Sequence, residues 1–205
     1  KIKNGTLSLD QEFLVSKKAW KKGGSKMFIE VDERVKVFDL LLGIVVQSGN
    51  DASIALAEGI SGTEETFAIE MNNLAKKIGL TDTNFVNSSG WPNDSHYTTA
   101  KDLALLAKYT VENHPELYQM YELNEFTYNG IKQDNRNPLL FTFDGADGFK
   151  TGYTEAAGYG IVGSAERGGR RLIIVLNGLE SSRSRAQESL RIMDWGFNNF
   201  ELVNF

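Results

Sequence analysis

The spacing of apolar residues predicts helices over much of the chain. Apolar residues dominate 34–47, which predicts a mostly buried helix, and the alanine-rich stretch 50–60 predicts a second, shorter one. Residues 99–113 have apolar positions at helical spacing and end at a proline, which predicts another helix. The last helix is expected from about Ser182 to Phe200.

One further helix is expected between the second helix and residue 79. Its apolar positions recur four, seven and eleven residues after the first, as one stripe on a helix surface does. The residues of this stripe are Phe67, Met71, Leu74 and Ile78. Ser61 and Glu64 fit a capping box at its start, and Gly79 fits its end.

After residue 125 the pattern changes to short strands. Asn129-Gly130 lies between 126–128 and 131–133 and is typical of a type I′ hairpin turn. Residues 158–165 and 171–177 predict a second hairpin. Helices, hairpins and a closing helix predict a mixed α/β chain of the α+β kind, with an antiparallel sheet flanked by helices. A Rossmann fold is excluded because strands and helices do not alternate.

Composition narrows the chemistry. The chain has 205 residues, no cysteine, two histidines and a net charge of −5. It therefore has no thiolate chemistry and few candidates for a histidine metal centre, and nucleic acid is not expected as a partner. The sequence has no run of 18 apolar residues, so a membrane-spanning helix is not expected. Hydroxyl, lysine, asparagine, tyrosine and carboxylate groups remain as candidates.

Positive charge is concentrated at the start of the chain. Residues 1–26 contain seven lysines against Asp10 and Glu12. Such a run is usually a solvated face or hairpin, and the alternative is a patch for an anionic polymer. The sequence leaves both open.

Two short motifs carry candidate chemistry. Ser48-Gly49-Asn50 lies at the junction of two predicted helices, where a hydroxyl and an amide can face a cleft. Lys150-Thr151-Gly152 follows 102 residues after Ser48 and supplies a positive charge, a hydroxyl and a position where a substrate backbone can approach. Each alone is also compatible with an ordinary turn or helix cap.

Together with their surroundings, these motifs resemble the low-molecular-mass penicillin-binding proteins, and in particular the serine D-alanyl-D-alanine carboxypeptidases. The segments that carry the resemblance are Ser48–Ala52, Met71-Asn72, Phe85–Gly90, Tyr97–Asp102, Phe126–Gly130, Asn135–Asn137 and Asp147–Tyr159. The resemblance implies a β-lactamase/transpeptidase-like fold in one penicillin-binding domain over 1–205. It also implies removal of the terminal D-alanine from peptidoglycan pentapeptide stems through a serine acyl-enzyme that β-lactams inhibit.

The resemblance also implies residue roles. Ser48 would relay a proton to the leaving amine, Asn50 would hydrogen-bond the substrate peptide, and Lys150 would set the field of the cleft. Thr151 and Arg136 would bind the terminal carboxylate.

Two further substrate-binding positions follow on the same segment. Gly152 would let the substrate backbone approach, and the backbone N–H of Tyr153 would form half of an oxyanion hole. The resemblance implies no metal or organic cofactor. It implies a location outside the cytoplasm, in the periplasm or at the cell surface.

One departure from the family pattern is important. The family nucleophile is the serine of S-x-x-K, and no serine in this sequence has lysine three positions later. We therefore expect the nucleophile outside this chain, an incomplete N-terminal part of the domain, and no activity of the chain alone. We also expect no second β-rich domain and no membrane anchor in it.

Three alternatives follow from that departure. The first is a non-catalytic fragment or pseudoenzyme that binds wall peptide or a partner chain. The others are a D,D-endopeptidase and a class A-like β-lactamase, which is disfavoured because Gly49 stands where such enzymes usually have aspartate.

Overall fold

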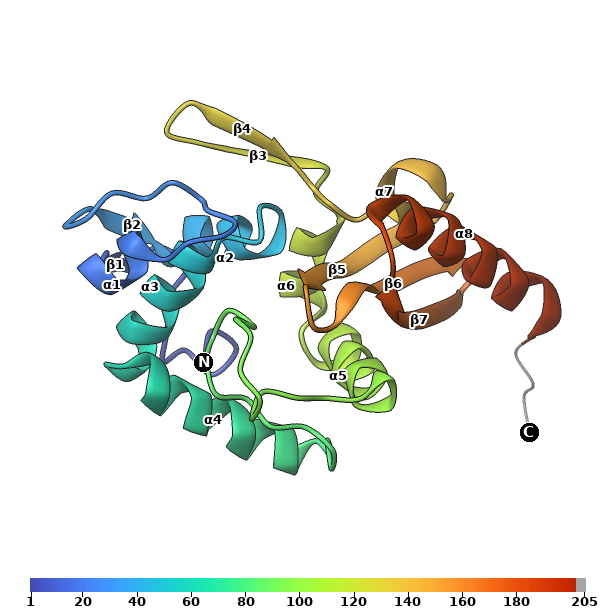
Figure 1. The fold of residues 1–205 in the computed structure, drawn as a ribbon, viewed down its shortest axis with the longest axis horizontal. Helices are drawn as coiled ribbons and strands as arrows, with labels where there is room; N and C mark the ends of the chain where they lie inside the picture. The colour runs from blue at the N-terminus through green and yellow to red at the C-terminus, as the bar shows by residue number, and fades with distance from the viewer. Residues whose placement is uncertain (202–205) are drawn as a thin grey trace. The chain divides into compact units, whose positions relative to one another are not determined.

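The computed structural model describes residues 1–201, which form two compact units (Figure 1). Unit 1 comprises 1–77, 81–97 and 125–135, and unit 2 comprises 78–80, 98–124 and the chain from 136 onward. A single domain over 1–205 stays a prediction.

Unit 1 contains four helices and two separate pairs of antiparallel strands. Along the chain these elements are β1 (Glu12–Leu14), α1 (Lys17–Lys21), β2 (Arg34–Lys36), α2 (Val37–Val45), α3 (Asn50–Ser61), α4 (Glu64–Lys77), β3 (Glu125–Tyr128) and β4 (Ile131–Asp134). Helix α3 is buried without interruption from Asp51 to Ala57, so it forms the centre of the unit.

The predicted helix over 50–60 is confirmed, whereas 34–47 is only partly helical. Residues 34–36 pair with β1, with Val35 opposite Phe13, and α2 begins at Val37. The alternation of Val35 and Val37 with polar neighbours favours a strand, and pairing with β1 outweighs the helical pattern.

The predicted start of α4 is wrong, and its predicted stripe is only partly buried, with Phe67, Met71 and Ile78 half-buried. Gly62 ends α3 with a positive φ of 79°, so Ser61 belongs to α3, and Thr63 accepts the Thr66 N–H at 3.0 Å instead. The buried positions of α4 include Ala68 and Ala75, while Leu74 is 45% exposed. The most buried apolar positions of α4 are therefore its alanines.

Unit 2 is built on one antiparallel sheet with the order β5-β6-β7. Its elements are α5 (Ala100–Asn113), α6 (Pro115–Tyr118), the 3₁₀ helix η1 (Gln119–Glu122), α7 (Leu139–Thr142), β5 (Ala146–Thr154), β6 (Gly158–Arg167), β7 (Arg170–Leu179) and α8 (Ser182–Asn199). The predicted helix over 99–113 is confirmed, with Thr99 as its N-cap.

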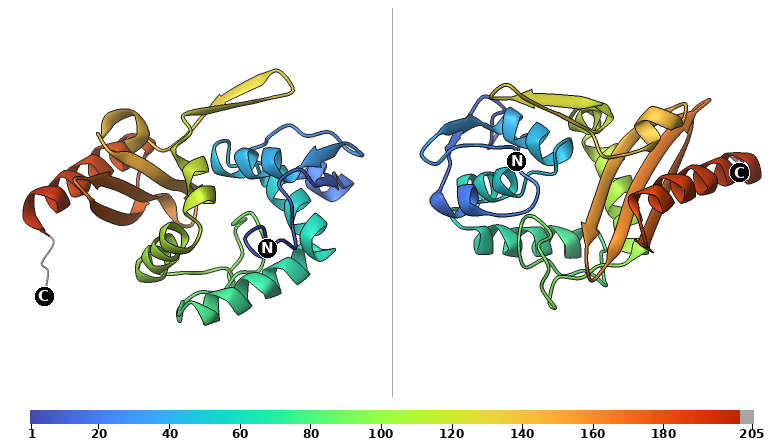
Figure 2. Two further views of the ribbon diagram at one scale, coloured as in Figure 1. Left: turned by 180° about the vertical axis from the view of Figure 1, so that it is seen from behind. Right: turned by 45° about the horizontal axis from the view of Figure 1, so that its top comes forward.

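Helices cover both faces of this sheet (Figure 2). On one face Ile161 and Ile174 pack with Leu139 of α7 and Met193 of α8. On the other face the neighbouring strand residues pack with α5, α6 and η1. That second cluster contains Ala107, Tyr118, Phe149, Val162 and Ile173. Successive strand residues point to opposite faces, so continuous apolar runs in β6 and β7 serve two cores.

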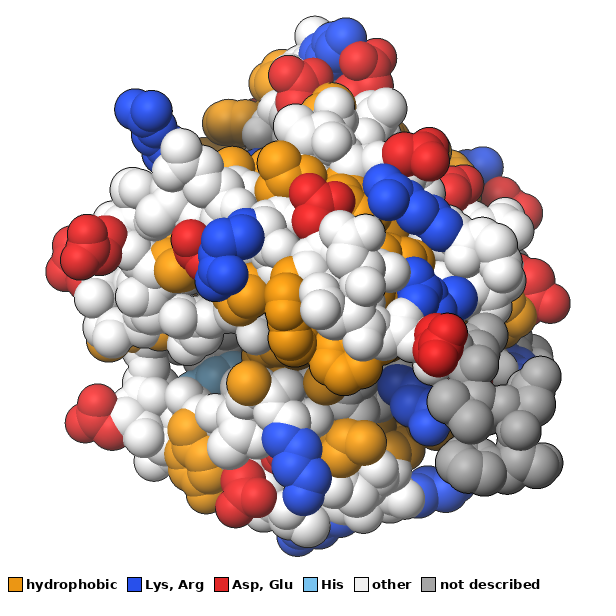
Figure 3. All heavy atoms as spheres, turned by 90° about the vertical axis from the view of Figure 1, so that its right-hand side faces the viewer, with side chains coloured by type: hydrophobic (Ala, Val, Ile, Leu, Met, Phe, Trp, Pro, Cys, Tyr) orange, Lys and Arg blue, Asp and Glu red, His pale blue; other side chains and the backbone are white. Residues whose placement is uncertain are grey.

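Both predicted hairpins are confirmed. Asn129 and Gly130 have φ of 47° and 74°, as a type I′ turn requires, and Gly168-Gly169 connects β6 to β7. The α+β prediction is confirmed as well. Within residues 1–201 no helix is long and apolar enough to cross a membrane. On the face shown in Figure 3, charges of both signs are interspersed among hydrophobic and polar side chains.

Candidate active site

Ser48 and Asn50 lie in unit 1, at the sharp connection from α2 to α3. Ser48 is half-buried and has a positive φ of 59°, which is uncommon for serine and marks a constrained turn. Gly49 is required there, because an added Cβ would lie 2.8 Å from an Asp51 carboxylate oxygen and 3.0 Å from the Met27 nitrogen. Asn50 begins α3. We call Ser48 and Asn50 the Ser48 group.

Asp51 holds the segment before α2 against this turn, and sequence reasoning gave it no role. Its carboxylate is fully buried and accepts N–H groups of Met27 at 2.9 Å, Phe28 at 3.0 Å and Ala52 at 2.9 Å. An acidic residue in the first turn of a helix was the available signal. This signal is not sufficient by itself, because the N–H groups of Met27 and Phe28 come close to Asp51 only when the chain folds.

Asn50 is fixed by the same segment. Its backbone N–H donates to the Ser25 carbonyl at 2.8 Å, and its side-chain amide donates to the Gly23 carbonyl at 2.9 Å. One amide proton is thereby committed to the main chain, which sets the direction of the side chain. The Ser48 group is therefore built from neutral side chains held by backbone contacts.

The second motif lies on β5, an outer strand of the sheet of unit 2. Lys150 pairs with Val162 and Thr151 with Ile161, so β6 fixes the register of the motif. Thr151 is buried, and Lys150 donates to its carbonyl at 3.0 Å. Gly152 and Tyr153 are exposed. An outer strand of this kind can hydrogen-bond an extended peptide.

Three cationic side chains influence one another beside this strand. Burial, and then the positive charges of Arg136 and Arg185, lower the pKa of Lys150 from its usual 10.5 to about 7. Arg185, on α8, donates to the backbone carbonyl of Arg136 at 3.4 Å. We call Arg136, Lys150, Thr151 and Arg185 the Lys150 group. Desolvated like charges favour an anion between them.

Arg185 is a residue that sequence reasoning missed. It is half-buried, and its Nε is buried without a hydrogen-bond partner in the described part of the chain. The sequence gave no signal for Arg185, because Arg183 lies on the same predicted helix and the local sequence does not distinguish the two arginines.

Asn137 positions the residue next to it, Arg136. Asn137 is fully buried, donates to the Gly148 carbonyl at 2.7 Å and accepts the Leu139 N–H at 3.0 Å. These bonds tie the segment that carries Arg136 to β5. The amide therefore keeps Arg136 and Lys150 in one neighbourhood.

The beginning of β5 is held by a charged network. Arg171 pairs with Asp147 at 2.6 Å and with Glu166 at 2.6 Å, and Tyr118 donates to Asp147 at 2.6 Å. Burial, together with the hydrogen bond to Asp147, raises the pKa of Tyr118. The phenol therefore stays protonated and keeps donating.

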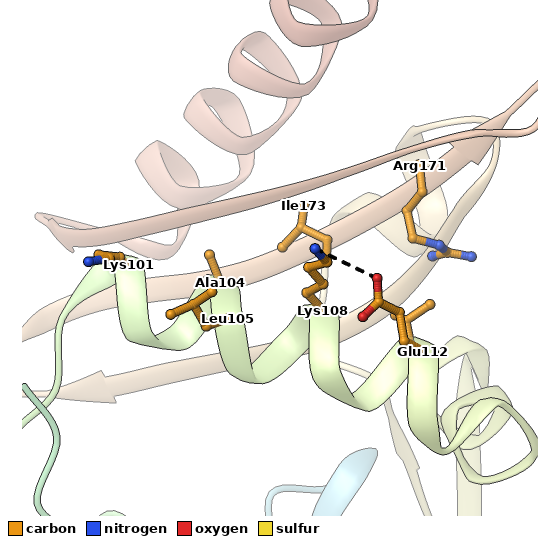
Figure 4. A pocket seen from close by; sticks show the side chains of 8 residues that line it. Lys101, Ala104, Leu105, Lys108, Glu112, Arg171 and Ile173 are labelled. Atoms are coloured by element: carbon orange, nitrogen blue, oxygen red, sulfur yellow. Dashed lines mark ion pairs between the residues drawn. The ribbon is translucent and has the colours of Figure 1, made fainter. Parts of the chain in front are cut away.

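A pocket of about 450 Å³ lies elsewhere in unit 2, between α5 and β7 (Figure 4). Apolar residues such as Leu105 and Ile173 line it, with Arg171 and the Lys108–Glu112 ion pair at 3.8 Å. None of the predicted site residues lines it. We therefore place the candidate chemistry on β5 and not in this pocket.

The structure thus places Arg136 and Arg185 close enough to Lys150 to lower its pKa, and Thr151 follows Lys150 on β5. Ser48 and Asn50 form a separate group in unit 1. In residues 1–201 no group of three or more His, Asp or Glu side chains is placed to hold a metal ion.

Comparison with known proteins agrees with the fold. The profile of the S11 peptidases, described as D-alanyl-D-alanine carboxypeptidase, matches residues 1–180. The chain therefore belongs to the D-alanyl-D-alanine carboxypeptidase family of serine peptidases, and its fold is that of the penicillin-binding proteins and DD-transpeptidases.

Particular relatives support this membership. D-alanyl-D-alanine carboxypeptidase DacC of Escherichia coli is 42% identical over 209 residues, which cover 98% of this chain and 52% of the relative. DacF of Bacillus subtilis is 37% identical, over 98% of this chain and 52% of the relative. The chain spans about half the length of these curated relatives.

Solved structures give the same result. The D-alanyl-D-alanine carboxypeptidase DacD from Francisella tularensis superposes with a TM-score of 0.95 at 37% identity, covering 98% of this chain and 61% of that one. Penicillin-binding protein 5 from Haemophilus influenzae gives 0.94 at 39% identity, covering 98% and 60%. The Streptomyces K15 DD-transpeptidase gives 0.88 at 27% identity, covering 95% and 81%.

Proposed function

We propose that this chain provides the substrate-binding part of a peptidoglycan D,D-carboxypeptidase, which removes the terminal D-alanine from pentapeptide stems. The observation that carries the proposal is the Lys150 group, where three cations and the hydroxyl of a buried threonine lie at an outer strand. A peptide that ends in a free carboxylate needs such partners.

The individual roles follow the chemistry of the side chains. Thr151, Arg136 and Arg185 bind the terminal carboxylate, and Lys150 holds positive charge beside them. Gly152 leaves room for the peptide backbone, and the backbone N–H of Tyr153 donates to the oxyanion of the tetrahedral intermediate.

Ser48 and Asn50 have roles of their own. The Ser48 hydroxyl passes a proton to the leaving amine, and the Asn50 amide binds the substrate peptide bond. The acyl-enzyme forms on a serine of an S-x-x-K motif, which this sequence does not contain, so the chain alone binds without hydrolysing. Activity is placed outside the cytoplasm, where peptidoglycan and β-lactams occur.

Two measurements on the 205-residue chain test the proposal. Titration with diacetyl-L-lysyl-D-alanyl-D-alanine should show saturable binding that the L-alanyl-L-alanine isomer does not match. Thr151→Val, which keeps the shape and removes the hydroxyl, should weaken that binding about tenfold, as expected for loss of a hydrogen bond to a charged group. Equal binding of the two isomers would contradict the proposal.

The second measurement is the intact mass after incubation with benzylpenicillin. No adduct is expected, because activation of a serine here would require a lysine three positions later. An adduct on this chain would show that one of its own serines is the nucleophile, and the assignment of that step outside the sequence would be wrong.

A further inference from the structure

A second group of candidate binding residues lies in unit 1, next to Asn50, and none of the roles proposed above uses it. The ammonium group of Lys22 lies 3.8 Å from the centre of the Trp91 ring, and the Trp91 side chain is 42% exposed. A cation over an exposed indole is a stable arrangement that leaves the charge open to a further ligand.

Gly24 joins this pair directly to the Ser48 group. A Cβ added at Gly24 would lie 2.6 Å from the Asn50 side-chain nitrogen and 3.2 Å from a Trp91 ring carbon. Only the bare backbone of Gly24 therefore separates the indole from the Asn50 amide.

The charge around the pair is positive. Lys26 lies near the exposed Trp20, at 6.0 Å from its ring centre, and donates to its carbonyl at 2.6 Å. In the described residues, the ion pairs of the lysines between 17 and 26 involve Lys18 alone. We call Lys22 and Trp91, together with Trp20, Lys21 and Lys26 of the same segment as Lys22, the Lys22–Trp91 surface.

The two segments that carry Lys22 and Trp91 are joined through Glu64. Lys18 of α1 pairs with Glu64 at 3.0 Å, and Glu64 accepts the Ser88 hydroxyl at 2.8 Å. Burial opposes ionisation of Glu64, but these bonds outweigh it and lower its pKa. The turn that carries Trp91 is closed by Asn87, which accepts the Gly90 and Trp91 N–H groups at 2.8 and 3.0 Å.

This preorganisation means that a ligand does not have to order the surface on binding. Fixed cations beside flat apolar rings suit a chain that carries carboxylates on an extended backbone. We propose that the Lys22–Trp91 surface binds an anionic, carboxylate-bearing part of the wall polymer whose peptide end reaches Asn50. The identity of the polymer rests on the proposed function.

The test is cosedimentation of the 205-residue chain with purified insoluble peptidoglycan sacculi. A matched sample of sacculi has its free carboxylates converted to amides. Lys22→Gln and Trp91→Ala should each lower retention on untreated sacculi about fivefold, and Lys22→Glu should lower it further. Amidated sacculi should retain the unaltered chain no better than untreated sacculi retain the Lys22→Gln variant.

Two controls match the changes. Trp195→Ala removes an indole that is 50% exposed on α8, and Lys76→Gln removes an exposed lysine of α4. Both should leave retention unchanged. Thermal unfolding of each variant shows that the fold is kept, and Lys22→Gln, which alters only a side-chain end, stays informative if Trp91→Ala destabilises the turn.

Soluble diacetyl-L-lysyl-D-alanyl-D-alanine separates this proposal from the proposed function. Its binding should be equal in the unaltered chain and in Lys22→Gln, because it lacks the polymer. Unchanged retention of Lys22→Gln, or equal retention on amidated sacculi, would overturn the Lys22–Trp91 surface. Failure of the proposed function has a different signature, in which the unaltered chain does not bind the soluble peptide while Lys22-dependent retention persists.

Discussion

The Ser48 group and the Lys150 group are stabilised in opposite ways. In unit 1 a single buried carboxylate, Asp51, gathers backbone N–H groups and fixes neutral side chains around a turn. In unit 2 strand pairing fixes the backbone, and the side chains are cations, of which Arg136 and Arg185 lower the pKa of buried Lys150. The first group suits proton relay and orientation, whereas the second suits capture of an anion.

The largest expected effect concerns the support of the Ser48 group. Asp51→Ala leaves buried N–H donors without an acceptor, which should lower the free energy of unfolding by about 3 kcal/mol. Urea denaturation measures this, and hydrogen exchange should locate the loss in residues 23–28. Asp39→Ala is the control. Asp39 also lies in the first turn of a helix, but its carboxylate accepts no hydrogen bond from a backbone N–H of the described residues.

Asp39→Ala should change stability by less than about 0.5 kcal/mol. If Asp51→Ala changed it as little, the Ser48 group would not depend on that carboxylate. The comparison between the two groups would then lose its physical basis.

A smaller loss in the free energy of unfolding is expected for the ion pairs at the start of β5, the strand that carries Lys150. Arg171→Met breaks the pairs with Asp147 and Glu166, whose side chains are 19% and 46% exposed. Discounted for solvent screening, the cost should be about 2 kcal/mol in the free energy of unfolding. Arg191→Met removes a fully surface pair with Glu188 and should cost less than about 0.5 kcal/mol. Equal effects of the two substitutions would show that the network at the start of β5 adds no stability.

The pH dependence of anion binding should distinguish the two groups. Protonated Lys150 attracts a carboxylate, and a bound carboxylate raises its pKa from about 7. Binding should therefore take up a proton above pH 7, and affinity should fall by up to about tenfold per pH unit as pH rises toward 9. Isothermal titration calorimetry in buffers of different ionisation enthalpy measures that proton. Affinity that does not change over this range would mean that Lys150 does not contact the anion.

Without ligand, stability should change with pH in the opposite direction. Folding lowers the pKa of Lys150 from 10.5 to about 7, so between these values the unfolded chain holds the additional proton. The free energy of unfolding from this group therefore rises with pH across that window. Lys150→Met should remove this rise, and a slope that persists in the variant must come from another group.

The smallest effect is expected at Arg185. Arg185→Gln should weaken binding of the soluble D-alanyl-D-alanine peptide about fivefold, equivalent to roughly 1 kcal/mol. It should also raise the pH at which affinity begins to fall, because one like charge beside Lys150 is gone. Arg183→Gln is the control, because Arg183 lies two residues earlier on α8 and its side chain is exposed. Identical behaviour of the two variants would remove Arg185 from the Lys150 group.

The sequence predicted what local pattern determines. Both hairpins, the helices at 50–60 and 99–113, and the positions of the two motifs followed from turn residues, periodicity and resemblance. The buried alanines of α4, Ala68 and Ala75, were missed because alanine gives a weak hydrophobic signal.

Residues that act through distant contacts were also missed. Asp51 gains two of its donors from residues 27 and 28, and Arg185 reaches the Arg136 carbonyl across 49 positions. Nothing in the local sequence distinguishes Arg185 from Arg183. Trp91 and Lys22 likewise meet only in the folded chain.

The most direct test of the central claim compares two ligands that differ only at their end. The 205-residue chain is titrated at pH 6.5 with diacetyl-L-lysyl-D-alanyl-D-alanine and with its C-terminal amide. Recognition of a terminal carboxylate by the Lys150 group predicts that the acid binds at least about tenfold more tightly, and that Arg136→Gln reduces this preference. Equal affinity for the acid and the amide would contradict the account.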